Sequence, residues 1–475
     1  MFNFRCSVCR RKYSAFEDLL ICPHCKGTLL VEYEDLDGQF EAKRRDIWKY
    51  RNVLPIDTRN LISLGEGATP LHTATRLLER LDLGVELFLK NEIVNPTGSF
   101  MDRGSSVVIT ACKRKRYLSV SVISRGNFGA SIAAYSAKAG IHCTVHIPPN
   151  IDLGKLYQTI LYGAEVKLIR DLDKIINNYS LIESPDSYPI LPNNPYFLEG
   201  LKTIAYEIAE QLNFDLPDLV IIPMGNGGCI SMIWKGFKEL VKIGLINEIP
   251  SLVGVQIAGA DPIVRKFYGI KEEKTKTDAY ISDISVENPL NVDLAIRAMK
   301  DTKGFAVSVS YGEVMKAVNQ LASLEGLFVE PAAAATIAAL DRINKMGKSI
   351  EGVKIVCLLT GSGLKDPVIA EELTKRVREV LNIRPKFSQR IPSRIGRTKL
   401  MILRILKEEP LHGYGIWKIL KERGIEVSLP TVYQHLAELE NMKLVASERK
   451  EIMKNTKLFR LTERGRKVER ILESG

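Results

Sequence analysis

The sequence has no apolar run long enough to cross a membrane, for which about 20 consecutive apolar residues are needed. The N-terminus also lacks the apolar core of a signal peptide and carries a Cys-x-x-Cys pair, Cys6 and Cys9, in its place. Apolar residues make up 45% of the 475 residues and charged residues 26%, as in a globular protein with a large core. We therefore expect a cytoplasmic protein of two or three domains that has no membrane partner.

The first 383 residues have almost no excess of either charge, with 46 Lys and Arg against 45 Asp and Glu. From Arg384 to the end, 21 Lys and Arg stand against 11 Asp and Glu, a net charge of +10. A basic C-terminal module on a neutral body favours a polyanion as the partner of that module. The alternative is a basic face that only contacts solvent.

Half of the eight cysteines form two pairs near the N-terminus, Cys6-x-x-Cys9 and Cys22-x-x-Cys25. Two such pairs can present four thiolates in a tetrahedron, which suits a structural zinc ion. No coordination position would then be open for catalysis. Disulfide bonds are the alternative, and a cytoplasmic location argues against them. The other cysteines lie in apolar surroundings that are typical of a core: Cys112, Cys143, Cys229 and Cys357.

Between residues 85 and 380, predicted strands alternate with predicted helices, which indicates an α/β protein with a mainly parallel sheet. The predicted strands are residues 85–90, 119–123, 142–147, 166–169, 218–223, 252–257 and 354–359. The predicted helices include residues 128–139, 153–163, 199–212, 229–243, 312–324 and 331–346. Ligands of such sheets bind beyond the carboxyl ends of the strands, so the loops that follow strands are candidate sites.

Four segments at strand ends carry residues suited to ligand binding. The stretch Asn95-Pro96-Thr97-Gly98-Ser99-Phe100-Met101-Asp102-Arg103-Gly104 joins a strand to a helix and can aim N–H groups and hydroxyls at one point. In Ser124-Arg125-Gly126-Asn127, Arg125 could bind a phosphate or carboxylate with two hydrogen bonds, or lie in solvent. Gly225-Asn226-Gly227-Gly228 could close around a phosphate at a helix N-terminus, or be a plain turn. Thr360-Gly361-Ser362-Gly363-Leu364-Lys365-Asp366-Pro367 follows the last strand.

Together these segments resemble those of threonine synthases, which are fold type II enzymes that use pyridoxal phosphate. The resemblance covers roughly residues 1 to 380. It implies a zinc ribbon and connector in residues 1–45, with Cys6, Cys9, Cys22 and Cys25 as ligands, and a body of two parallel-sheet subdomains in residues 46–380. It also implies cofactor contacts: the phosphate with Gly225, Asn226, Gly227 and Gly228, the phenolic oxygen with Asn127, and the pyridine nitrogen with Thr360. Ser99 and Arg125 are expected to contact the substrate or another ligand.

One residue departs from the pattern at its centre. Met101 stands where the family has the lysine that forms a Schiff base with the cofactor. A thioether can supply neither a primary amine nor a proton-transferring group, and Met101 is expected to be a buried apolar gap-filler. No nearby lysine is an obvious substitute for the missing lysine, and we expect a structural role for Lys90. Ala68 and Ser362 also differ from the family residues Asn and His.

Residues 381–397 carry two prolines and many basic residues, as in a basic linker. Residues 398–475 then predict three helices, a hairpin over residues 444–449 and 457–462, and a last helix. This pattern predicts a winged helix-turn-helix. It resembles PadR-like regulators through the Leu-His-Gly-Tyr, Thr-Val-Tyr-x-His-Leu and Leu-Thr-x-x-Gly motifs that begin at Leu411, Thr431 and Leu461.

The resemblance to PadR-like regulators implies DNA as the partner, with the third helix in the major groove. The expected DNA-contacting residues are Ser428, Thr431, Tyr433, Gln434 and His435 in the helix and Lys450, Lys454 and Lys457 in the wing. For Tyr433 and His435, packing between helices is an equal alternative. Two half-sites need two readers, so we expect a homodimer.

These features favour a ligand-sensing transcriptional regulator built on a catalytically disabled threonine synthase-like domain. Its pocket would hold an amino acid, a phosphorylated amino acid or non-covalent pyridoxal phosphate, and binding would change the spacing of the winged helices. The alternative is an active threonine synthase, which converts O-phosphohomoserine to threonine and phosphate, with an added DNA-binding domain. A third hypothesis is a metabolic scaffold whose winged helix binds proteins.

Overall fold

The computed structural model describes residues 2–56, 60–149, 151–169, 187–270, 281, 283–345, 350–380, 397–449 and 457–473. The chain divides into two compact units, Met1–Lys375, called the body below, and Arg376–Gly475, the C-terminal unit. Among the described residues, no helix has both the length and the apolar character that crossing a membrane requires.

The body begins with a three-stranded antiparallel sheet in the order β2-β1-β3. Its strands are β1 (Phe2–Cys6), β2 (Lys12–Ser14) and β3 (Leu29–Tyr33). Phe4 of β1 is completely buried and packs edge-on against Tyr196, with ring centroids 5.8 Å apart. The aromatic residues of this small sheet therefore join it to the core of the body, as does Tyr33, whose hydroxyl donates to Glu199.

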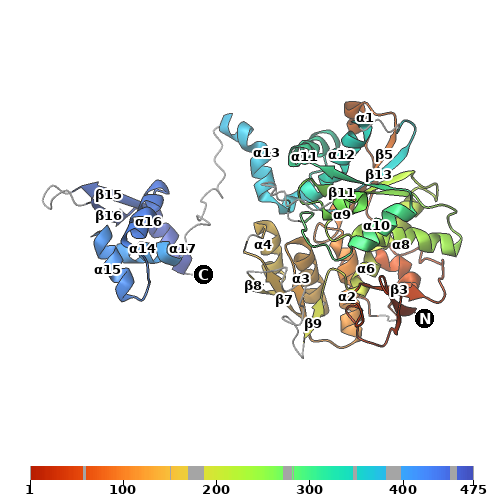
Figure 1. Cartoon of the computed structure of the whole chain (residues 1–475), viewed down its shortest axis with the longest axis horizontal. Helices are drawn as coiled ribbons and strands as arrows, with labels where there is room; N and C mark the ends of the chain where they lie inside the picture. Colours follow the sequence, from red (N-terminus) through yellow and green to blue (C-terminus); the bar gives the residue numbers. More distant parts are fainter. Residues whose placement is uncertain are drawn as a thin grey trace. The chain divides into compact units, whose positions relative to one another are not determined.

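Two larger sheets form the two halves of the body (Figure 1), and this confirms the predicted pair of parallel-sheet subdomains. One has the order β8-β7-β6-β9 and is entirely parallel, with β6 (Ser119–Ile123), β7 (His142–Ile147), β8 (Glu165–Leu168) and β9 (Ser187–Ile190). The other has the order β12-β11-β10-β13-β5-β4, in which only the edge strand β4 is antiparallel. Its strands are β4 (Leu71–Thr73), β5 (Glu86–Asn91), β10 (Leu219–Pro223), β11 (Ser251–Ile257), β12 (Phe305–Val309) and β13 (Lys354–Leu359).

Helices alternate with these strands. They are α1 (Thr75–Leu81), α2 (Met101–Arg114), α3 (Asn127–Ala139), α4 (Leu153–Leu161), α6 (Pro195–Leu201), α7 (Thr203–Gln211), α8 (Gly228–Ile243), α9 (Pro262–Tyr268), α10 (Val292–Asp301), α11 (Tyr311–Glu325), α12 (Pro331–Lys345) and α13 (Pro367–Val380), with short 3-10 helices η1 (Ile47–Val53), η2 (Glu92–Val94) and η4 (Gly363–Lys365). The single helix predicted over residues 199–212 is wrong. Asn194 and Pro195 start α6 earlier, and a turn at Lys202 separates α6 from α7.

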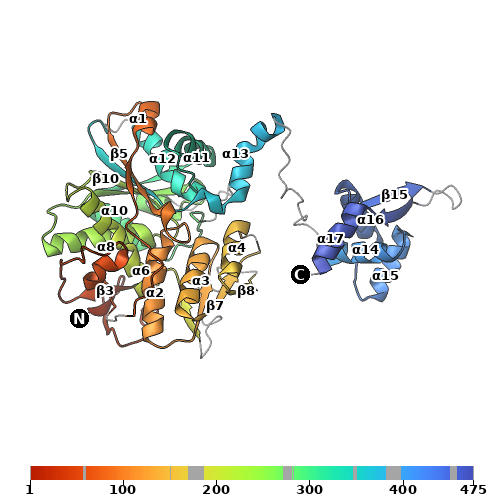
Figure 2. The same cartoon turned by 180° about the vertical axis from the view of Figure 1, so that it is seen from behind.

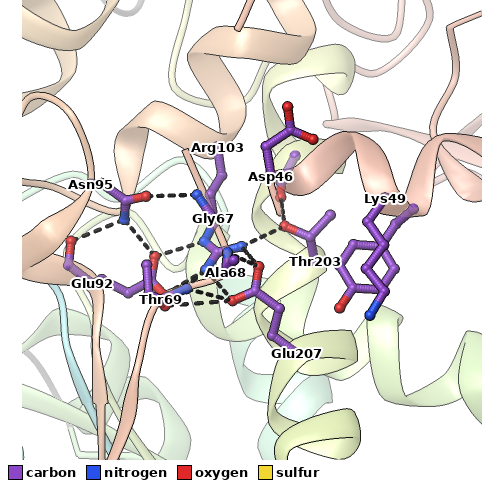
Figure 3. A network of polar contacts seen from close by, with 12 residues as sticks. Asp46, Lys49, Gly67, Ala68, Thr69, Glu92, Asn95, Arg103, Thr203 and Glu207 are labelled. Atoms are coloured by element: carbon purple, nitrogen blue, oxygen red, sulfur yellow. Dashed lines mark hydrogen bonds and ion pairs between the residues drawn. The ribbon is translucent and has the colours of Figure 1, made fainter. Parts of the chain in front are cut away.

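A buried ion network connects helices of the body to the 65–71 segment (Figure 3). The Arg103 guanidinium in α2 donates to Glu92 at 2.6 Å and to Glu207 in α7 at 2.7 Å, and all three side chains are buried. Glu207 also accepts from Lys90 of β5 at 2.7 Å and from the backbone N–H of Ala68 at 2.8 Å. Lys90 is completely enclosed by these contacts, which supports the structural role expected for it.

The C-terminal unit is a winged helix-turn-helix with a compact group of helices (Figure 2). Its elements are α14 (Arg397–Glu408), β14 (Leu411–His412), α15 (Gly413–Glu422), α16 (Leu429–Asn441), β15 (Val445–Arg449), β16 (Lys457–Leu461) and α17 (Glu463–Glu473). The predicted hairpin is present, and the short strand β14 extends it to three strands in the order β14-β16-β15. A separate apolar core includes Ile402, Ile416 and Leu436.

Candidate functional site

The glycine loop, Gly225-Asn226-Gly227-Gly228, follows β10 and leads directly into the 16-residue helix α8. Gly227 has φ of 78°, a left-handed conformation that favours glycine. A Cβ at Gly225 would lie 2.6 Å from the Asp283 carbonyl oxygen, so a side chain there would collide with backbone. The loop therefore brings bare backbone to the N-terminus of α8, where the free N–H groups and the helix dipole attract an anion.

A second wall of the site is the start of α2. Met101 is the first residue of this helix and is partly buried, and both Met101 and Phe100 line a cavity of about 130 Å³. Ser99 is completely buried behind them, and its hydroxyl accepts from the Met101 N–H at 3.4 Å. The structure thus places Met101 at the cavity and Ser99 beneath the turn rather than among the cavity-lining residues.

The third and fourth walls come from the loops after β6 and β13. Arg125 and Asn127 line the cavity, and Asn127 is buried at the first position of α3. Thr360 lines it from the other sheet, and its carbonyl oxygen accepts from the Phe100 N–H at 3.0 Å. The carboxyl ends of β6, β10 and β13 therefore meet at one cavity, as the strand-end argument predicts. The predicted residues Gly225, Asn226, Gly227 and Gly228 line it as well.

A group of charged side chains beside the cavity was missed by sequence reasoning. The Asn127 amide donates to Glu330 at 2.8 Å and accepts from Lys365 Nζ at 2.5 Å. Lys155 of α4 contacts Asp283 and lies 3.9 Å from Glu330. The sequence offered no obvious substitute amine, but the structure brings two lysines to the pocket. Lys155 and Lys365 are brought to it from positions far apart in the chain.

Burial shifts the pKa values of the carboxyl and amine groups in this cluster. It raises the pKa of the Glu330 carboxyl, and the nearby charge of Asp283 adds to this effect. Burial also lowers the pKa of Lys365 below its usual value, against the raising effect of Glu330. Lys365 stands in the segment that follows Thr360, so that motif could have pointed to it. No local pattern marks Lys155.

The residues present fit pyridoxal phosphate as a non-covalent ligand. The glycine loop offers backbone where a Cβ would collide, and Asn127 and Thr360 border the same cavity. The chemistry at position 101 does not fit a covalent attachment, because a thioether cannot form an imine.

The four N-terminal cysteines form a separate candidate metal centre. Their sulfur atoms all lie within 4.8 Å of one another, with Cys6 and Cys25 3.4 Å apart and Cys9 and Cys22 3.6 Å apart. Zinc–sulfur bonds of about 2.3 Å in a tetrahedron place sulfur atoms about 3.8 Å apart. The donor set and its spacing therefore fit one structural zinc ion.

In the C-terminal unit, the side chains of α16 lie on two sides of the helix, one packed in the core and one exposed to solvent. Val432 and Leu436 are buried in the core, while Tyr433 and Gln434 are exposed. His435 is partly buried, with Nδ1 3.5 Å from Glu438. Exposure thus makes Tyr433 and Gln434 available to a ligand, although the Tyr433 ring also packs on Gly413, where a Cβ would lie 2.5 Å from it.

The remaining predicted DNA-contacting residues lie at the ends of α16 and in the wing. Ser428 caps α16, and its hydroxyl accepts from the Thr431 N–H at 3.3 Å. Lys457 is exposed and pairs with Glu440 at 3.0 Å. Lys450 and Lys454, like residues 381–396 of the predicted linker, lie outside the described residues.

Comparison with protein families assigns both units. Residues 62–361 match the family model of pyridoxal-phosphate dependent enzymes. The chain belongs to this family. Residues 402–470 match the PadR-like family of transcriptional regulators, so the C-terminal unit is a PadR-like domain.

Individual relatives refine the assignment of the body. A threonine synthase of Methanocaldococcus jannaschii is 40% identical over 382 residues, covering 76% of this chain and 93% of the relative. A threonine synthase of Methanosarcina acetivorans is 37% identical, covering 77% and 93%. Among solved structures, maize serine racemase has a TM-score of 0.55 at 22% identity, covering 66% of this chain and 93% of its own, which shows a shared fold. The chain thus combines a threonine synthase-like body, a cluster of four cysteines and a PadR-like domain.

Proposed function

We propose that this chain is a ligand-sensing transcriptional regulator whose threonine synthase-like pocket has lost its catalytic amine. One observation carries the proposal: Met101 begins α2 at the wall of a cavity that Asn127, Thr360 and the glycine loop still border. The PadR-like domain on the same chain would supply the output, by binding DNA.

The chain's own residues would hold a ligand without reacting with it. Pyridoxal phosphate, when bound, would supply an aldehyde and an electron-withdrawing ring. The glycine loop would bind its phosphate, Asn127 its ring oxygen and Thr360 its ring nitrogen. Met101 would pack against the ligand and could neither accept nor donate a proton. An amino acid or a phosphorylated amino acid is the other ligand class, with Arg125 binding its carboxylate or phosphate through two hydrogen bonds.

Sensing requires that the ligand bind more tightly to one DNA-affinity state of the protein than to the other. We propose that the regulator acts as a homodimer in which two winged helices bind two half-sites. By linkage, any factor by which the ligand changes DNA affinity must equal the factor by which DNA changes ligand affinity.

The test combines ligand retention with DNA binding. The purified chain would be mixed with pyridoxal phosphate, dialysed, and a portion reduced with borohydride before peptide mapping. Its binding to DNA from its own promoter region would be measured by gel shift with and without the cofactor. Retention without an adduct, together with a change in DNA affinity, is the expected result. An adduct on a pocket lysine would overturn the loss of amine chemistry. Promoter-specific binding would argue against the scaffold hypothesis, and DNA binding without sequence preference would leave that hypothesis standing.

An active threonine synthase is the second candidate, and Lys365 favours it. This buried amine has a lowered pKa and hydrogen-bonds to Asn127 at the cavity wall. A lowered pKa favours the neutral, nucleophilic form of an amine, so Lys365 could replace the missing lysine. Release of phosphate from O-phosphohomoserine by the wild-type chain, abolished by Lys365→Arg, would establish this function. No release in either protein would exclude it.

A further inference from the structure

The N-terminal sheet with its four-cysteine cluster and Thr28, called the ribbon below, is connected to the glycine loop through Asn291. The hydroxyl of Thr28 donates to Asn291 Oδ1 at 2.9 Å, and both residues are buried, with 4% and 2% of their surface exposed. Asn291 in turn donates its backbone N–H to the carbonyl oxygen of Asn226 at 3.0 Å. Three residues thus join the ribbon to the loop that borders the cavity.

Each end of this connection is anchored. At the ribbon end, the Thr28 carbonyl oxygen accepts from the Ser7 N–H at 2.9 Å, and a Cβ on Gly27 would lie 3.0 Å from Cys6 Sγ. Thr28 is therefore held by the same loops that bring the cysteines together. At the other end, the Asn291 carbonyl oxygen lies 3.0 Å from where a Cβ of Gly227 would be.

The Asn291 side chain does not cap the helix that Asn291 precedes. Asn291 is the N-cap of α10, where an asparagine ordinarily accepts a hydrogen bond from its own helix, yet it makes no such bond. Its oxygen turns to Thr28 instead. Its Nδ2 has no hydrogen-bond partner among the described residues and lies 3.5 Å from where a Cβ of Gly228 would be. Leaving a buried donor unpaired destabilises a fold, and this donor lies beside the start of α8.

We propose that Asn291 is a positioning residue of the phosphate site and that Thr28 of the ribbon holds it in place. Asn291 fixes the glycine loop through its backbone, and its free N–H adds a positive group near the N-terminus of α8. The ribbon thereby supports binding of a phosphate monoester at the glycine loop. This inference rests on the proposed ligand pocket and names the part of the ligand, a phosphate, that the connection serves.

Thr28→Val and Asn291→Ala would test the connection, with Tyr33→Phe as the matched control. Tyr33 is also in the ribbon, and its hydroxyl donates to Glu199 of the body at 2.7 Å, away from the glycine loop. Affinities for pyridoxal phosphate and for pyridoxal, which lacks the phosphate, would be measured for each protein. Both test variants should weaken pyridoxal phosphate binding by roughly 3- to 10-fold, the value of one net hydrogen bond, and leave pyridoxal unchanged. Tyr33→Phe should change neither.

A second measurement needs no ligand. Amide hydrogen exchange of the glycine-loop peptide should be faster in Thr28→Val than in the wild type, and unchanged in Tyr33→Phe. If the wild type binds no pyridoxal phosphate, the proposed ligand fails while loop exchange still decides the connection. Equal effects of Thr28→Val and Tyr33→Phe would overturn the proposal, because the ribbon would then support the body only in general. Unchanged exchange and affinity in Thr28→Val would overturn it as well.

Discussion

At the scale of single residues, the proposed loss of the catalytic amine rests on Met101, the first residue of α2 at the cavity. Under that proposal, installing an amine at the start of α2 should permit covalent attachment of the cofactor, because the surrounding loops border the cavity. We expect Met101→Lys, treated with pyridoxal phosphate and borohydride, to carry a stable adduct on residue 101 in the peptide map. Met101→Leu, which has similar volume and no amine, is the control and should carry none. An unmodified residue 101 in Met101→Lys would show that the pocket no longer positions the cofactor.

Ala68 has a backbone conformation that is strained for an alanine. Ala68 is exposed and has φ of 48°, in the left-handed region that glycine and asparagine tolerate better than alanine. We expect Ala68→Gly to raise the free energy of unfolding by about 0.5–1 kcal/mol, measured by urea denaturation. The same substitution at the exposed helical residue Ala137 should lower it by about 1 kcal/mol. A loss of stability in both variants would contradict the claim that the left-handed backbone conformation strains Ala68.

At the scale of elements, the ion network of Figure 3 connects β5, η2, α2 and α7. Burial disfavours the charge of Glu207, but Arg103 and Lys90 outweigh it and hold the pKa of Glu207 below its usual value. Glu207→Gln would remove the ion-pair partner of buried Lys90 and leave buried Arg103 paired with Glu92 alone. We expect the variant to lose about 3–5 kcal/mol of unfolding free energy near pH 7. Glu210→Gln is the control on the same helix, where partly exposed Glu210 pairs with Lys49, and should lose at most about 1 kcal/mol.

The pH dependence of the effect of Glu207→Gln follows from the lowered pKa of Glu207 in the folded protein. A carboxyl with a depressed pKa in the folded state contributes stability that is complete above its unfolded pKa of about 4.3 and is lost as the pH falls toward the folded value. The difference between wild type and Glu207→Gln should therefore be constant from about pH 6 to pH 8 and shrink below about pH 4. Denaturation curves at several pH values would measure it. A difference that grows on acidification would contradict the assignment of Glu207 as the charged partner.

Sequence pattern predicted those elements that have strong local signals. All seven strands predicted in the body are present, with ends shifted by at most one residue, because runs such as Ile355–Leu359 are continuously apolar. The sequence pattern did not predict β4, β9 or β12 of the two large sheets. β4 is a three-residue edge strand, β9 contains Pro189, and β12 is a five-residue strand whose place depends on pairing with β11. The gap between α6 and α7 at Lys202 was missed for a similar reason, since Lys202 is buried against Glu239 of another helix.

The candidate site was predictable where its residues lie in one motif and not where distant segments meet. Asn127, Thr360 and the glycine loop each follow a recognisable strand, and they do line one cavity. Lys155 and Asn291 belong to no motif, and their roles depend on contacts between residues more than 100 positions apart. Burial and hydrogen bonding of this kind are properties of the tertiary fold, which periodicity and spacing do not encode.

At the scale of the whole molecule, the excess of positive charge is concentrated in the C-terminal part of the chain. The last 92 residues have a net charge of +10 and the preceding 383 a net charge of +1, so the C-terminal unit should dominate any salt-dependent binding to DNA. Lys457→Ala, in the wing, should reduce the slope of log affinity against log salt by about 0.9, the loss of one phosphate contact. Arg76→Ala removes the same charge from an exposed position in α1 of the body and should leave the slope unchanged. Equal slopes for both variants would indicate that Lys457 makes no phosphate contact.

Base recognition should behave differently from phosphate contact in the same assay. Gln434 is exposed on α16, and an amide there can bind an adenine edge with two hydrogen bonds. We expect Gln434→Ala to weaken binding to the specific promoter site by about 1–3 kcal/mol, while the salt slope and the affinity for unrelated DNA stay the same. Competition gel shifts with specific and unrelated duplexes would measure the ratio of the two affinities. An equal loss on both duplexes would mean that Gln434 acts only through the shape of α16, and α16 would then not be the helix that reads sequence.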